Sequence, residues 1–165
     1  MSFIPPQNFG YVEPDLYRSA IPDEMNFLFL QTLDLKTVVY LSFDAPSVIL
    51  SEFFKEQGIH FVQINEAEGA RISHKLVLDA LRVILNPDAY PVLVMCNLGR
   101  HRTGTVIGCL RRLQNWTLSS IFDEFRRFTG AKPSPVHEQF IELFDTELVE
   151  IPNDVNRLPF EIKLN

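Results

Sequence analysis

The sequence predicts an α/β fold in which a central, mainly parallel sheet is flanked by helices. Two observations lead to this prediction. Short runs of β-branched and apolar residues alternate along the chain with longer segments that carry apolar residues at helical spacing. Strands separated by helices favour a layered α/β architecture with parallel pairing. In such sheets ligands bind at the carboxyl ends of the strands, so functional residues are expected there.

Four strands are expected from their apolar and β-branched composition. Residues 16–18 form a short first strand, and residues 37–41 (TVVYL) and 60–64 (HFVQI) are typical of buried strands. Residues 90–95 (YPVLVM) form the most apolar run, with Pro91 near its start, where a strand tolerates proline. We expect this run at the centre of the sheet.

Six helices are expected between and after these strands, over residues 23–33, 47–57, 73–85, 102–115, 118–128 and 136–148. Gly58 ends the second helix, and Asn86-Pro87 ends the third. The third has the clearest pattern, because one helix face carries Val77, Leu78, Leu81, Ile84 and Leu85.

Length and composition predict one globular domain. The chain has 165 residues, 46% hydrophobic and 22% charged, which is the composition of a folded protein rather than a disordered one. A chain of this length needs no disulfide or metal ion to fold. We therefore expect a single domain over residues 1–165, with a core over about residues 5–148 and an irregular C-terminal tail over residues 149–165.

Charge and cysteine content argue against several classes of function. The 15 Lys and Arg residues are outnumbered by 21 Asp and Glu residues, and the net charge of −6 disfavours nucleic-acid binding, which needs a positive surface. No apolar run has the length of a membrane span, and the N-terminus lacks the features of a signal peptide. Two cysteines cannot build a disulfide framework and suggest a reducing compartment. A cytoplasmic protein without nucleic-acid or membrane partners is expected.

The segment whose residues are most suited to catalysis runs from Cys96 to Thr103. Cys96 follows the most apolar strand, and a helix is expected to begin at Arg102. A short loop between a strand and a helix N-terminus directs its backbone N–H groups into one concavity, which binds phosphate-like anions. Gly99 permits the backbone angles that such a loop needs. The residues expected to bind phosphate are Asn97, Leu98, Gly99, Arg100 and His101.

The same loop is expected to activate Cys96 as a nucleophile. Thiols at helix N-termini beside arginine have pKa values lowered from about 8.5 to about 3.5–7.5, and the thiolate is the nucleophilic form. Arg102 is expected to hold two oxygens of the phosphoryl group through the transition state. Thr103 is expected to donate its hydroxyl to the sulfur when the sulfur departs.

Other interpretations of this segment are weaker. A cysteine at a strand end is most often a small buried hydrophobe, but the arginine six residues later favours catalysis here. Cys109 lies within a predicted helix and is interpreted as a core residue. Gly99 and Gly104 have the spacing of a nucleotide-binding P-loop, but Thr105-Val106 replace its Lys-Ser/Thr. The histidines show no metal-ligand spacing, so no metal or other cofactor is expected.

Cys96-x5-Arg102-Thr103 resembles the signature of the cysteine-dependent protein tyrosine phosphatase superfamily. More specifically, the chain resembles the plant and fungal atypical dual-specificity phosphatases in residues 5–9 (PPQNF), 16–19 (LYRS), 96–104 (CNLGRHRTG), 113–116 (LQNW) and 121–128 (IFDEFRRF). That group includes inositol pyrophosphate phosphatases and the fungal oxidant-induced cell-cycle arrest proteins, whose loops are the most similar. The resemblance implies a compact cysteine-phosphatase fold, no cofactor and a phospho-cysteine intermediate on Cys96.

Two departures from the family pattern bear on activity. Met95 stands where most active members have histidine. The loop over residues 65–73, which corresponds to the one that usually carries an aspartate as general acid, has none. Glu66 and Glu68 are the candidates for protonating the leaving group, and the alternative is that both are solvated loop carboxylates. A leaving group that is itself a phosphate departs without a proton more easily than an alkoxide.

Basic residues near the loop bear on the substrate. Arg71, His74 and Lys75 precede or begin the helix over residues 73–85 and are expected to contact the ligand together with Arg100 and His101. Such a rim fits a polyanion better than a phosphotyrosine ring, which prefers an apolar cleft.

The leading interpretation is therefore a cysteine-dependent phosphohydrolase. Its expected partner is a phosphorylated small molecule, such as an inositol pyrophosphate, or a phosphotyrosine protein. The alternative is a phosphatase-like, phosphate-binding subunit of a signalling complex with low activity. Met95 and the missing aspartate favour the alternative, whereas Cys96, Arg102 and Thr103 favour the enzyme.

Overall fold

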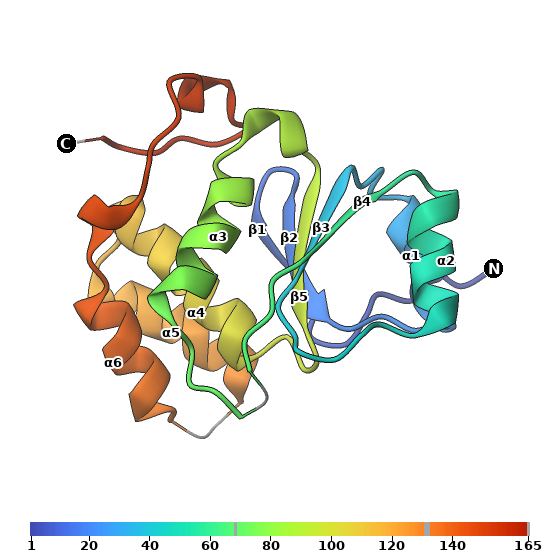
Figure 1. Cartoon of the computed structure of the whole chain (residues 1–165), viewed down its shortest axis with the longest axis horizontal. Helices are drawn as coiled ribbons and strands as arrows, with labels where there is room; N and C mark the ends of the chain where they lie inside the picture. Colours follow the sequence, from blue (N-terminus) through green and yellow to red (C-terminus); the bar gives the residue numbers. More distant parts are fainter. Residues whose placement is uncertain (68, 131–132, 165) are drawn as a thin grey trace.

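A five-stranded sheet lies between two layers of helices (Figure 1). The structure is a computed structural model that describes residues 1–67, 69–130 and 133–164. The strands, in the order β1-β2-β5-β3-β4 across the sheet, are β1 (Gly10–Glu13), β2 (Leu16–Ala20), β5 (Val92–Cys96), β3 (Thr37–Tyr40) and β4 (His60–Gln63). All neighbouring pairs are parallel except β1 and β2. The predicted α/β fold with a mainly parallel sheet is confirmed.

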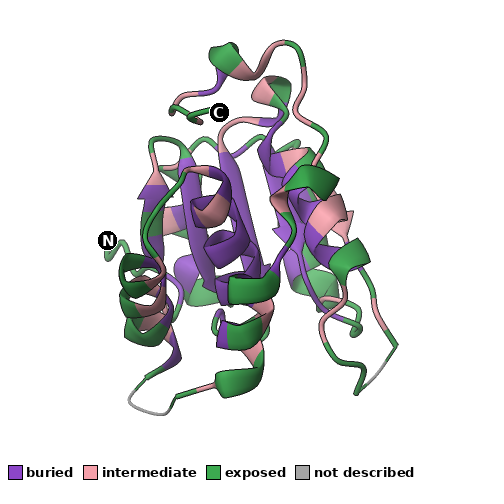
Figure 2. Ribbon diagram, turned by 90° about the vertical axis from the view of Figure 1, so that its left-hand side faces the viewer, coloured by how far each residue is buried: buried purple, intermediate pink, exposed green. Residues whose placement is uncertain are grey.

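The helices divide between the two faces of the sheet. One face is covered by α1 (Phe27–Gln31) and α2 (Val48–Glu56), and the other by α3 (His74–Ile84), α4 (His101–Leu113), α5 (Leu118–Thr129) and α6 (Pro135–Leu143) (Figure 1). The three inner strands are buried along their whole length, whereas the helices expose many residues (Figure 2). In the described part of the chain, no helix is both long and apolar enough to cross a membrane.

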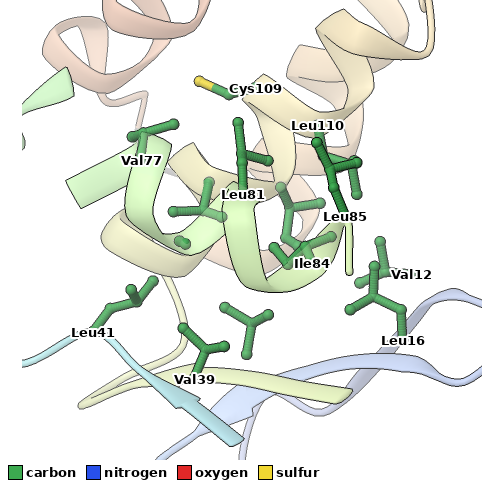
Figure 3. Packing of buried hydrophobic residues seen from close by; sticks show 14 of the residues in the cluster. Val12, Leu16, Val39, Leu41, Val77, Leu81, Ile84, Leu85, Cys109 and Leu110 are labelled. Carbon is green, nitrogen blue, oxygen red and sulfur yellow. The ribbon is translucent and has the colours of Figure 1, made fainter. Parts of the chain in front are cut away.

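The larger hydrophobic cluster fills the space between the sheet and α3 and α4 (Figure 3). The predicted apolar face of α3 packs there, with Val77, Leu81 and Ile84 fully buried. Cys109 of α4 is also fully buried in this cluster, and burial raises the pKa of its thiol. Cys109 is therefore a core residue, as the sequence predicts.

Strand β5 is central, and its position sets the place of the functional loop. Val92, the first residue of β5, pairs with Leu16 of β2 on one side and with Thr37 of β3 on the other. The three strands therefore begin at the same level in the sheet. At the other end Cys96 pairs with Ala20 of β2. The carboxyl ends of three parallel strands thus meet where Cys96 ends β5, as the ligand sites of parallel sheets require.

Several element boundaries differ from those expected. Strand β1, which forms an antiparallel hairpin with β2, is not predicted from the sequence; it is short and lies at the sheet edge. The helix expected over residues 23–33 is a 3-10 turn (Glu24–Asn26) capped by Asp23, followed by α1. The final helix ends at Leu143 rather than residue 148, and a separate 3-10 turn, Thr146–Leu148, follows it.

Residues that follow α6 pack on the same side of the sheet as α3. Leu158 is buried in the larger cluster, and Ile151, Phe160 and Ile162 are partly buried against it. The C-terminal segment thus contributes apolar contacts to the core, although a 3-10 turn over Val155–Arg157 is the only regular element after Leu148 among the described residues.

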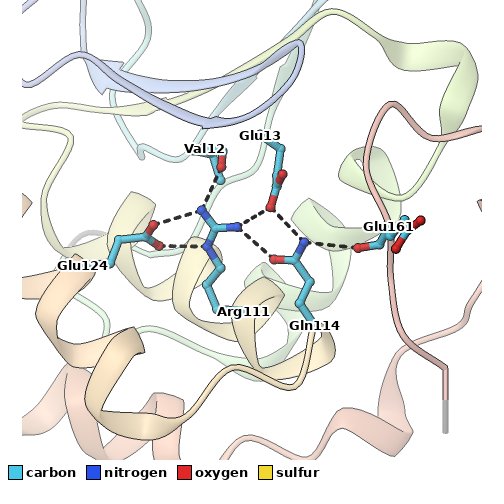
Figure 4. A network of polar contacts seen from close by, with 6 residues as sticks. All are labelled: Val12, Glu13, Arg111, Gln114, Glu124 and Glu161. Atoms are coloured by element: carbon cyan, nitrogen blue, oxygen red, sulfur yellow. Dashed lines mark hydrogen bonds and ion pairs between the residues drawn. The ribbon is translucent and has the colours of Figure 1, made fainter.

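A buried arginine joins α4 to the hairpin and to α5 (Figure 4). The side chain of Arg111 is 3% exposed, and its guanidinium donates to both carboxylate oxygens of Glu124, at 3.0 and 2.9 Å. It also donates to Glu13 at 2.6 Å, to the carbonyl of Val12 at 2.8 Å and to the side chain of Gln114 at 2.9 Å. These bonds fix α4, whose other end begins at the functional loop.

We predict that Arg111→Leu lowers the free energy of unfolding by about 3–5 kcal/mol, because Glu13 and Glu124 lose the charge that compensates them. Arg82→Leu is the control: Arg82 pairs with Asp79 on the surface of α3, and losing that pair costs about 0–1 kcal/mol. Urea unfolding of both variants measures the difference. Equal losses would contradict a structural role for the Arg111 network.

Candidate active site

Cys96 is the last residue of β5, residues 97–100 form the loop, and α4 begins at His101. Arg100 is the N-cap of α4 and makes no side-chain capping bond. The backbone N–H groups of Leu98, Gly99 and Arg100 have no hydrogen-bond partner among the residues described. Free amides next to an uncapped helix N-terminus are the arrangement that binds anions in other proteins. Phosphate binding by this loop stays a prediction.

Gly99 is required at its position for two separate reasons. Its φ is +65°, in the left-handed region that glycine adopts without strain. A Cβ atom there would lie 2.5 Å from the backbone N of Ala20 and 2.5 Å from the backbone C of Ser19. The loop therefore packs directly on the backbone at the end of β2, and no side chain fits between them.

The three residues predicted to perform the chemistry lie at the two ends of this loop, Cys96 at the end of β5 and Arg102 and Thr103 in the first turn of α4. Cys96 is 6% exposed, Arg102 is half-buried, and Thr103 is fully buried. Nη1 of Arg102 makes a long contact of 3.5 Å with the carbonyl of Leu41, just beyond β3, and Arg102 has no ion pair with any described residue. The hydroxyl of Thr103 is buried without a partner in the described part of the chain. Neither side chain therefore makes a short polar contact within the described part of the chain.

Met95 does not face this loop as a functional side chain. It is fully buried in the smaller hydrophobic cluster with Tyr40 and Phe53, on the side of the sheet covered by α1 and α2. Its backbone carbonyl accepts from the N–H of Leu41 at 2.8 Å. The thioether therefore fills a core position.

His101, in the first turn of α4, stacks on His137 of α6. Their ring centroids are 4.6 Å apart and the planes differ by 8°. Desolvation and the nearby Arg100 lower the pKa of His101, and desolvation and His101 lower that of His137. The pKa of each ring therefore lies below the value of about 6.5 of an unperturbed histidine.

The two glutamates considered as general acid differ in what the structure shows. Oε1 of Glu66 accepts from the backbone N–H of Ser73 at 3.0 Å, at the start of α3. The other oxygen, Oε2, is buried without a partner among the residues described. Glu66 is therefore a partly buried carboxylate held in place, not a freely solvated one. Glu68 lies outside the described residues.

The rim residues predicted near the ligand are engaged to different degrees. His74 packs against Phe140 of α6, with ring centroids 4.9 Å apart, and Lys75 forms an ion pair with Asp79 one turn later on α3. Arg71 and Arg100 are exposed and have no ion pair in the described part of the chain. Contact of these residues with a substrate stays a prediction.

The sequence alone assigns no role to Asn8 and Arg18, yet both contact the functional loop. The amide nitrogen of Asn8 donates to the carbonyls of Leu98 and Gly99, and Nη2 of Arg18 donates to the carbonyl of Gly99. Both residues lie in segments that carry the family resemblance, residues 5–9 and 16–19. The resemblance marks both residues in the sequence but does not show what they contact. The contacts join residues 81 to 91 positions apart, and no local sequence pattern predicts such pairs.

The comparison with known proteins agrees with this geometry. A model described as "Tyrosine phosphatase family" matches residues 3–161. The chain belongs to this family. It is 53% identical over 154 residues to the probable tyrosine-protein phosphatase DG1060 of Dictyostelium discoideum. This alignment covers 91% of this chain and 93% of that protein. The chain is 41% identical over 147 residues to the inositol diphosphatase DSP4 of Arabidopsis thaliana, covering 87% of this chain and 74% of that protein.

A solved structure shows the same fold. The core catalytic domain of the PP-IP phosphatase SIW14 from S. cerevisiae, in complex with citrate, matches with a TM-score of 0.88 and 42% identity over 96% of this chain and 98% of that chain. The resemblance inferred from the sequence motifs is confirmed, and so is the phosphatase fold that it implies.

We predict that Gly99→Ala abolishes oxyanion binding, because the added methyl group must push the loop off the backbone of Ser19 and Ala20. Gly58→Ala is the matched control, since Gly58 has a φ of +66° and nothing within 4 Å of its Cβ position. Both variants should lose about 1–2 kcal/mol of stability from backbone strain, but only Gly99→Ala should lose tungstate binding in calorimetry. Wild-type affinity in Gly99→Ala would refute the steric argument.

Proposed function

We propose that the protein is a cysteine-dependent phosphohydrolase that forms a phospho-cysteine intermediate on Cys96 and acts on a polyanionic phosphate of the inositol pyrophosphate type. The observation that carries the proposal is the combination in one loop of Cys96, unpaired backbone amides and Arg102, which has no anionic partner in the described chain. This combination supplies a nucleophile and a binding site for the phosphoryl oxygens.

In the first step the Cys96 thiolate attacks phosphorus, an S–P bond forms, and the bond to the leaving oxygen breaks. The loop amides and Arg102 hold the equatorial oxygens, whose charge must be stabilised throughout the transfer. Where the leaving group needs a proton, Glu66 in its protonated form donates it. In the second step a water molecule attacks phosphorus, the S–P bond breaks, and inorganic phosphate leaves. The hydroxyl of Thr103 then donates a hydrogen bond to the departing sulfur.

The rim favours a highly charged substrate. Arg71 and Arg100 are exposed and carry no ion pair among the described residues, and an anion with several phosphates can contact cations outside the loop as well as inside it. Two relatives are named for inositol diphosphatase activity, DSP4 and SIW14. A phosphoanhydride also releases a phosphate, which needs little help from a general acid.

Phosphotyrosine is the second candidate substrate, and one observation favours it. Leu98 in the loop and Phe43 after β3 are exposed apolar residues, 56% and 47% exposed. Such side chains can contact an aromatic ring. DG1060 is named as a probable tyrosine-protein phosphatase.

We predict faster hydrolysis of an inositol pyrophosphate than of an aryl phosphate, compared as kcat/KM from phosphate release. Glu66→Gln should reduce the rate with the aryl phosphate by about 10²–10⁴-fold and the rate with the pyrophosphate much less. Glu56→Gln, an exposed residue at the end of α2, is the control and should affect neither.

Two results would contradict these assignments. Equal effects of Glu66→Gln on both substrates would remove Glu66 as general acid, and a preference for the aryl phosphate would favour the phosphotyrosine candidate. Cys96→Ser should bind tungstate without turnover, because a serine hydroxyl is not ionised in this loop; retained hydrolysis would remove Cys96 as nucleophile. Tungstate binding by the wild type without any hydrolysis would instead indicate a phosphate-binding subunit.

A further inference from the structure

Three of the four carbonyl groups in the loop over residues 97–100 accept hydrogen bonds from residues near β2 and the N-terminal segment. The carbonyl of Asn97 accepts from the N–H of Ile21 at 3.4 Å, just beyond β2. The carbonyl of Leu98 accepts from Nδ2 of Asn8 at 3.3 Å. The carbonyl of Gly99 accepts from Nδ2 of Asn8 and from Nη2 of Arg18, both at 3.1 Å. Three successive carbonyls are thus held by residues outside the loop.

The direction of these carbonyls also fixes the direction of the backbone N–H groups in the loop. A trans peptide is planar, and its N–H points opposite to its C=O. The bonds in this loop are trans, since Tyr90-Pro91 is the cis peptide of the chain's described part. The carbonyls of Asn97, Leu98 and Gly99 point toward the residues that donate to them. The N–H group of each following residue, in Leu98, Gly99 and Arg100, therefore points the other way, into the concavity.

Asn8 is well placed to fix this orientation. Its φ is +56°, in the left-handed region that asparagine tolerates better than most residues. The preceding carbonyl, that of Gln7, accepts from the N–H of Ala20 at 2.9 Å, which ties the N-terminal segment to the end of β2. Nδ2 of Asn8 also donates to the carbonyl of Phe128 in α5 at 2.9 Å. One side-chain amide therefore connects the loop to α5 and to the N-terminal segment.

Arg18 places a buried positive charge under the same loop. It is 1% exposed, and its guanidinium lies over the ring of Phe128, 3.7 Å from the centroid. Burial lowers the pKa of Arg18 to about 10, while negative charge on Glu124 and Cys96 opposes that shift. Arg18 is therefore charged at pH 7. Nε and Nη1 of Arg18 are buried and have no hydrogen-bond partner in the described part of the chain. Leaving buried donors unpaired costs stability, and the single bond from Nη2 to Gly99 does not compensate for it.

We propose that Asn8 and Arg18 are positioning residues of the phosphate site: they hold the Leu98 and Gly99 carbonyls outward so that the loop amides face the bound oxyanion, and Arg18 adds positive charge beneath it. The inference rests on the proposed function only in taking the ligand of the loop to be a phosphoryl group. It concerns binding and the state of Cys96, both of which can be measured without turnover.

The test compares Asn8→Gly with Asn115→Gly. Asn115 has a φ of +60° and donates through Nδ2 to the carbonyl of Lys163, away from the loop, so both replacements keep a permitted backbone and remove one side-chain amide. Asn8→Gly should weaken tungstate binding about 10- to 100-fold, since hydrogen bonds to a charged group lose their alignment. Asn115→Gly should leave it unchanged. Equal affinities in the two variants would overturn the role of Asn8.

Arg18→Met separates positioning from stability and carries the test if Asn8→Gly does not fold. Methionine keeps the apolar contact with Phe128 but removes a buried charge with two unpaired nitrogens, so the melting temperature should be retained or raised. Tungstate binding should still weaken, and alkylation of Cys96 by iodoacetamide should require a higher pH. Lowered stability with unchanged tungstate affinity and alkylation would show a purely structural role and overturn the proposal.

The outcomes also distinguish this inference from the proposed function. A wild-type protein that binds tungstate but hydrolyses nothing would refute the function and leave the comparison of variants valid. An active wild type whose Asn8→Gly and Arg18→Met variants bind tungstate normally would refute the positioning role alone. A wild type without affinity for tungstate would refute both.

Discussion

The close contact between the functional loop and the end of β2 is the constraint on which the rest of the site depends. Gly99 lies so near the backbone of Ser19 and Ala20 that a methyl group does not fit, and its left-handed backbone turns the chain toward α4. The loop can adopt this shape only because β2 and β5 are adjacent and parallel, with Ala20 level with Cys96. Sheet register therefore determines where Cys96 and the loop amides meet.

Two buried arginines connect this loop to the remainder of the fold in different ways. Arg111, toward the far end of α4, is fully engaged by carboxylates and a carbonyl and holds the helix against the hairpin and α5. Arg18 lies under the loop with few partners of its own. A buried charge that is well paired mainly holds structure together, whereas one that is poorly paired raises the potential around it. Arg111 therefore contributes mainly to stability, whereas Arg18 raises the positive potential around the loop.

Features set by local sequence could be predicted, and features set by distant contacts could not. The apolar run ending at Cys96, the face of α3 and the loop that begins at Asn97 are local patterns, and the structure places each within one residue of the expected position. Strand β1 is too short to predict alone and forms by pairing with β2. The contacts of Asn8 and Arg18 with the loop depend on sheet order, which sequence periodicity does not specify.

Trapping the covalent intermediate tests the central claim most directly. The wild-type protein is mixed with a phosphoanhydride substrate, quenched in acid within the first turnover, digested and analysed by mass spectrometry. We predict one phosphoryl group on the peptide that contains Cys96, and none on that peptide in Cys96→Ser. Phosphate release without any phosphorylated Cys96 peptide, or with the phosphoryl group on another residue, would contradict it.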